Sequence, residues 1–158
     1  MAAKALGILI LFLTALYYSQ SHQVAAKRSC DILSELCSLF SYILKNIECF
    51  TRPLDEICQG YSSPLLEQCG FFLHWQNRDL HRAVQSVPYL PESVQRFLFR
   101  YADTAGQGYK EEEVQLCRYT WEQLSELFHI QKEELKAKNK MYRTLPFLLV
   151  LSIVLLFY

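Results

Sequence analysis

Apolar residues recur every three to four positions through the centre of the chain, which is the spacing typical of amphipathic helices. Between residues 29 and 50, one apolar stripe keeps a seven-residue rhythm and a second stripe runs beside it. The first consists of Cys30, Leu33, Cys37, Phe40, Leu44 and Ile47, and the second of Ile32, Leu36, Leu39 and Ile43. A face this wide predicts a helix buried between partners, because a single seam needs a narrower stripe.

Proline and glycine divide the chain after this helix. The segment "TRP" at 51–53 ends the first pattern, and Pro53 is suited to begin a short helix through Cys58. The segment "GYSSP" at 60–64 predicts a break, with Ser63 as the cap of a helix that runs from Pro64 through Trp75.

A further break is predicted at "VPYLP", residues 87–91. Pro91 is suited to begin a helix through Tyr101, and Gly106 in "TAGQG" is expected to adopt a left-handed conformation after it.

The last pattern is the longest, because no breaker stands between Tyr109 and Leu145. Its apolar positions are Val114, Cys117, Trp121, Leu124, Phe128 and Leu135. At 1.5 Å per residue this predicts roughly 50 Å of continuous helix. No strand pattern is evident, so the predicted fold is all-α, a compact bundle of about five to six helices.

Both ends of the chain are apolar. Residues 5–18 and 144–158 contain no charged side chain, and with their neighbours each approaches the roughly 20 residues that a membrane-spanning helix needs. We therefore predict membrane helices at 1–21 and 144–158, flanking a helical domain at 22–143. Basic residues are concentrated just before the apolar run at 144–158. This distribution predicts that the helical domain is cytoplasmic and that both termini lie outside.

Composition narrows the class of protein. Sixteen basic residues balance sixteen acidic ones, so net charge does not indicate a nucleic-acid partner. Five glycines and five prolines are too few for a turn-rich β protein or a disordered chain.

The six cysteines leave two topologies open. They are Cys30, Cys37, Cys49, Cys58, Cys69 and Cys117. A cytoplasmic domain would keep them reduced, and several occupy apolar helical positions where a thiol acts as a small hydrophobe. The alternative is an exported, disulfide-stapled domain with one C-terminal anchor, released by cleavage after Ala26 in "QVAA".

No catalytic pattern emerges from the residue types that carry chemistry. Cys69, His74 and His81 do not have the spacing of a zinc site. Cys117 and His129 stand twelve residues apart on one predicted helix, roughly 18 Å, which is too far for a nucleophile and its base. We therefore expect no enzyme activity, no metal, no cofactor, no nucleic acid and no small-molecule substrate.

One charged face points to a lipid surface. Lys132, Lys136, Lys140 and Arg143 are spaced by four, four and three residues, so they share one face of the last helix as it approaches the predicted membrane segment. These four are the candidate contacts to anionic lipid head groups, although a positive flank is also ordinary beside any membrane helix.

The chain resembles the stage III sporulation protein AB family. Three segments carry the resemblance: "LSELCSLFSYILKNIECFTRPLDEI" at 33–57, "FLFRYADTAGQG" at 97–108 and "KAKNKMYRTLPFLLVLSIVLLFY" at 136–158. They resemble the family's first long helix with its Pro-Leu start of a second, its central turn, and its closing basic segment and membrane helix. Asn46, Ala105, Tyr109 and Pro146 depart from the usual residues at their positions.

The resemblance implies a role in sporulation. Members are similar to the cytoplasmic helical domains of the type II secretion platform protein. They are expected in the mother-cell membrane, in a secretion-like channel complex that joins mother cell and forespore. A secretion-type ATPase and other membrane subunits are the implied partners. The resemblance thus predicts a scaffold or ATPase-docking platform.

Overall fold

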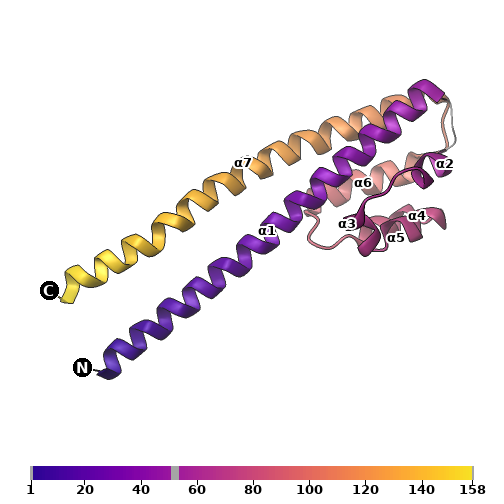
Figure 1. Cartoon of the computed structure of the whole chain (residues 1–158). Coiled ribbons are helices and arrows are strands. Elements are labelled where there is room, and N and C mark those ends of the chain that lie inside the picture. Colours follow the sequence, from indigo (N-terminus) through magenta and orange to yellow (C-terminus); the bar gives the residue numbers. More distant parts are fainter. Residues whose placement is uncertain (1, 51–53, 158) are drawn as a thin grey trace. The chain divides into compact units, whose positions relative to one another are not determined.

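A computed structural model describes the backbone of residues 2–50 and 54–157, and described side chains run, with gaps, from Leu13 to Met141. This part of the chain contains seven helices and no strand, which confirms the all-α prediction. The helices are α1 (Ala2–Phe50), α2 (Leu54–Gln59), α3 (Pro64–Gln68), α4 (Phe71–Gln76), α5 (Leu80–Ser86), α6 (Glu92–Thr104) and α7 (Lys110–Phe157) (Figure 1).

The chain divides into two compact units, and the two long helices belong to both. The body is residues Arg28–Ile130, which holds α2 to α6 and the inner parts of α1 and α7. The terminal unit is Met1–Lys27 together with Gln131–Tyr158.

Helix α1 is continuous over 49 residues, where the sequence predicted a separate N-terminal helix before the helix that starts at Ser29. Between Ile8 and Phe50 there is no glycine or proline to break it. The described fold is therefore five shorter helices and two long ones, and the continuity of the last helix into the C-terminal run agrees with the absence of breakers from Tyr109 to Leu145.

Among the described residues, no helix is both long enough and apolar enough to cross a membrane. The runs at 5–18 and 144–158 lie largely outside the residues whose side chains are described. The predicted boundaries at 1–21, 22–143 and 144–158 stay predictions.

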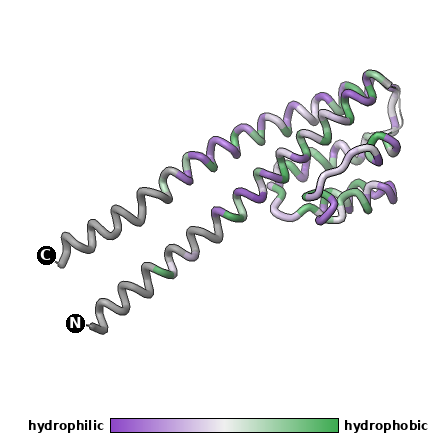
Figure 2. Tube along the Cα trace, in the orientation of Figure 1, coloured by the Kyte–Doolittle hydropathy of each residue, from purple (hydrophilic) through white to green (hydrophobic). Residues whose placement is uncertain are grey.

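The core of the body forms on the wide apolar face of α1. Leu33, Leu36, Leu39 and Ile43 are fully buried, so residues of both predicted stripes face inward. Each such side chain contributes about 1.5–3 kcal/mol relative to an exposed position. Core side chains alternate with hydrophilic ones along the body's helices (Figure 2).

Aromatic contacts join elements that are distant in sequence. The rings of Phe40 on α1 and Tyr101 on α6 meet edge to face at a centroid distance of 4.9 Å. From α7, Cys117 and Leu124 complete the same core. Helices α1, α6 and α7 of the body therefore share one interior.

One predicted helix is divided in two, and one predicted capping hydrogen bond is not made. Residues 64–75 form two helices, because Gly70 adopts a left-handed conformation, with φ 76°, between α3 and α4. Ser63 stands at the N-cap position of α3, but its side chain makes no capping hydrogen bond. Gly106 is left-handed after α6 as expected, with φ 80°.

Two residues other than glycine share this left-handed backbone. Arg78, between α4 and α5, and Tyr89, between α5 and α6, both have φ 59°. Side chains with a Cβ are disfavoured there by about 1–2 kcal/mol, so these two loops hold local strain.

Candidate functional site

The predicted basic face lies on one continuous helix, α7. Lys132 and Lys136 have exposed side chains, whereas the side chains of Lys140 and Arg143 lie outside the described residues. Lys136 Nζ pairs with Glu133 Oε1 at 2.7 Å. An exposed pair of this kind contributes little, so it leaves the ammonium group available to other anions.

The cysteines are thiols. No disulfide occurs in the described part of the chain, which includes all six of them, and this disagrees with the stapled alternative. Burial raises the pKa of Cys37 to about 11 and that of Cys117 to about 12. Since the thiolate is the reactive form, both groups are weak nucleophiles at neutral pH.

His81, considered above as a metal ligand, instead contacts an aspartate and an aromatic ring. His81 Nε2 lies 2.7 Å from Asp103 Oδ1, and its ring stacks on Phe99 at a centroid distance of 5.1 Å. No group of three or more metal-ligating side chains occurs among the residues described.

A surface groove of the body lies beside the α4–α5 and α6–α7 turns. It has a volume of about 980 Å³ and is lined by Ile47 and Leu54, by residues around the α4–α5 turn, and by residues of the α6–α7 turn. Trp75, Leu80, Ala102 and Ala105 extend its apolar lining, and the polar and charged lining includes Arg78, Asp79, His81, Lys110 and Glu113.

Both turns beside the groove are held by carboxylates. Asp79 accepts a hydrogen bond from the Arg82 amide at 3.0 Å, which caps α5, and pairs with the Arg82 side chain at 3.2 Å. Glu113 accepts a hydrogen bond from the amide of Gly106. Glu112 accepts one from the amide of Tyr109 at 3.1 Å.

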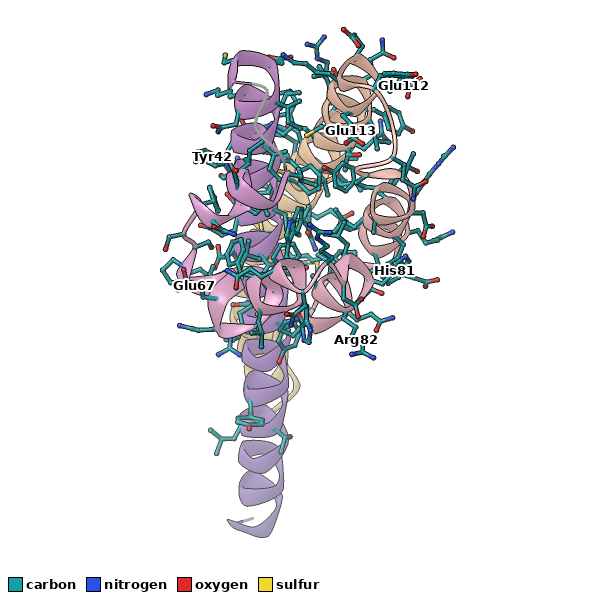
Figure 3. All side chains as sticks on the ribbon, turned by 90° about the vertical axis from the view of Figure 1, so that its right-hand side faces the viewer. Tyr42, Glu67, His81, Arg82, Glu112 and Glu113 are labelled. Carbon is teal, nitrogen blue, oxygen red and sulfur yellow. The ribbon has the colours of Figure 1, made fainter. Side chains whose placement is uncertain are left out.

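Figure 3 labels Glu112 and Glu113 beside the start of α7, and His81 and Arg82 beside α5. Glu112 and Glu113 stand in the first turn of α7, where acidic side chains favour a helix N-terminus. Their side chains also fix the preceding turn, a role that depends on the chain reversal at Gly106.

The groove was missed by sequence reasoning. Its lining comes from segments that are distant in sequence, and no spacing rule joins Trp75 to Lys110. The only local signal was the left-handed glycine expected at Gly106, which marks one side of it.

The fold and these surfaces define a class: an all-α protein with two long helices, a body of short helices, a groove of mixed charge and a basic face on one helix. A family model of stage III sporulation protein AB matches residues 4–158. The chain belongs to this family, as the resemblance predicted. No curated protein and no solved structure matches the chain.

Proposed function

We propose that this protein is a membrane-anchored structural component of a secretion-like channel complex between mother cell and forespore. It acts as a scaffold and as a docking platform for a secretion-type ATPase, without catalysing a reaction itself. The observation that carries the proposal is the family match, which extends over nearly the whole chain.

The surfaces of the body fit a docking role. Protein interfaces combine an apolar centre with a polar rim. The groove has this arrangement, with Trp75 and Leu80 among its apolar lining and Arg78, Lys110 and Glu113 among its charged lining. We propose this groove as the contact surface for the ATPase.

Strain at Arg78 favours a binding role for its side chain. A glycine would relieve the left-handed backbone at φ 59°, so the arginine is retained at a cost of about 1–2 kcal/mol to the fold. Residues held in such conformations gather at functional sites. Arg78 also lines the groove.

A pair of glycine variants tests the docking surface. Arg78→Gly is expected to raise the thermal unfolding midpoint, because it removes the strain, and to weaken capture of the ATPase about tenfold or more, because arginines are frequent hot spots. Tyr89→Gly is the matched control, since it has the same φ but does not line the groove.

Both variants should therefore be more stable, but only Arg78→Gly should bind less ATPase in co-purification of the full-length proteins. Equal ATPase binding by wild type and Arg78→Gly would rule out this groove as the contact. Failure of wild type to bind the ATPase at all would rule out the platform role.

A further inference from the structure

A cleft lies between the two helices of the terminal unit. It has a volume of about 300 Å³ and is lined by Gln23, Val24 and Lys27 from α1 and by Leu135 and Asn139 from α7. All five residues belong to the terminal unit, so the cleft does not depend on how this unit is joined to the body.

The residues that line the cleft include hydrogen-bond donors suited to a phosphate and apolar side chains suited to contact hydrocarbon. Lys27 contributes an ammonium group, and Gln23 and Asn139 contribute amide N–H groups, all donors to oxyanions. In the described part of the chain, none of these three side chains makes a hydrogen bond or ion pair. Val24, which is 53% exposed, and Leu135 supply the apolar part of the lining.

On both helices, the residues that line the cleft lie at the same distance in sequence from the apolar runs at 5–18 and 144–158. Gln23 stands five residues after Tyr18, and Asn139 stands five residues before Thr144. Lys27 and Leu135 are each nine residues from the same run ends. At 1.5 Å per residue, the lining lies about 7–14 Å beyond the runs.

That distance corresponds to the headgroup layer of a bilayer and the region just outside it, since each polar layer is about 5–8 Å thick. A lysine at its outer edge can extend back toward the phosphates along its aliphatic stem. The cleft is therefore at the right level for a headgroup if the two runs span the membrane.

Charge favours an anionic headgroup. Of the chain's sixteen basic and sixteen acidic residues, seven basic but only two acidic ones fall in the terminal unit. The two acidic ones, Glu133 and Glu134, are paired with Lys136 and Lys138. The terminal unit that contains Lys27 therefore has a net charge of about +5. A zwitterionic lipid has no net charge and would not neutralise it.

We propose that this cleft binds the headgroup phosphate of one anionic phospholipid, held by Lys27, Gln23 and Asn139, with its glycerol and first acyl carbons against Val24 and Leu135. The proposal rests on the membrane anchoring in the proposed function. It differs from the basic face of α7, where Lys136 and its neighbours attract a lipid surface by charge alone.

The test uses the full-length chain in a neutral detergent, titrated with dihexanoyl-phosphatidylglycerol and followed by native mass spectrometry. Wild type is expected to retain one lipid. Lys27→Gln should weaken this binding about fivefold, the effect expected of one lysine near a lipid surface. Asn139→Leu, which fills the cleft and removes a donor, should also weaken it.

Lys136→Gln is the matched control, since Lys136 does not line the cleft. It should change binding less than about twofold, because its exposed ammonium group lies outside the cleft and acts on the lipid only through charge that solvent screens. Circular dichroism checks that all variants keep the helical content of wild type.

Three results would overturn the proposal: equal weakening by Lys27→Gln and Lys136→Gln, equal retention of dihexanoyl-phosphatidylcholine, or displacement of the lipid by an equal concentration of inorganic phosphate. Membrane anchoring is measured separately, by resistance to carbonate extraction from the membrane fraction. Lipid binding by a chain that carbonate extracts would contradict the proposed anchoring while supporting the cleft.

Discussion

Cys117 is a core residue whose ionisation opposes folding. It is fully buried on α7, with its Sγ 3.7 Å from the backbone oxygen of Phe40. Burial is the main cause of its raised pKa, and the carboxylates of Glu113 and Glu48 add to it. The folded state therefore keeps the thiol protonated after an unfolded chain would release the proton.

This difference predicts a loss of stability at alkaline pH. Below pH 9, the thiol is protonated in both states, and its contribution to stability is complete. Between pH 9 and about 12, only the unfolded chain ionises, so the free energy of unfolding falls by up to about 1.4 kcal/mol per pH unit.

Cys117→Ala should reduce the loss of unfolding free energy between pH 9 and about 12. Thermal unfolding of the full-length chain in detergent across that pH range measures the loss. Burial raises the pKa of Tyr101 in the same direction, so part of the fall should remain in the variant. Parallel curves for wild type and Cys117→Ala would contradict the assignment to this thiol.

At the scale of elements, the connection between α6 and α7 shows how one glycine organises a turn. Gly106 has φ 80°, and a Cβ added there would meet no atom within 4 Å. The cost of replacing it is therefore conformational and not steric. Its amide also donates to Glu113, which ties the turn to the first residues of α7.

Gly106→Ala is expected to destabilise the fold by about 1 kcal/mol, because alanine disfavours the left-handed region. For a chain of this length, that lowers the unfolding midpoint by about 2–4 °C. Gly106→Asn should lose less, since asparagine tolerates this backbone better. A midpoint for Asn below that for Ala would show that backbone conformation is not the cause.

Sequence patterns predicted these elements where a residue acts locally. Gly106, the start of α3 at Pro64 and the continuity of α7 up to Leu145 follow from propensity and from the absence of breakers, whereas α7 also continues past Pro146 to Phe157. The break at Gly70 was missed because Leu65, Cys69 and Phe72 keep a spacing of four and three residues across it. The left-handed backbones of Arg78 and Tyr89 were not predicted, because neither residue type favours a positive φ.

At the scale of the whole molecule, membrane topology stays the main prediction, and the cysteines supply a reporter for it. Cys49 is exposed, whereas Cys58 and Cys117 are buried. If the body is cytoplasmic, a membrane-impermeant maleimide should not label Cys49 in intact cells and should label it after the membrane is opened.

Labelled sites are identified by mass spectrometry of the wild-type chain. Cys117 serves as the internal control, because it should react only after denaturation. Labelling of Cys49 in intact cells would place the body on the opposite side of the membrane.

The division of charge between the two units has a consequence for how copies crowd on a surface. The nine basic and fourteen acidic residues outside the terminal unit leave the body with an excess of five negative charges. Copies brought together in a complex, as proposed above, would meet with bodies of the same net charge, which repel over a Debye length of about 8 Å at physiological salt. Contact between neighbouring bodies would therefore cost electrostatic free energy, which a basic partner could offset by acting as their counterion.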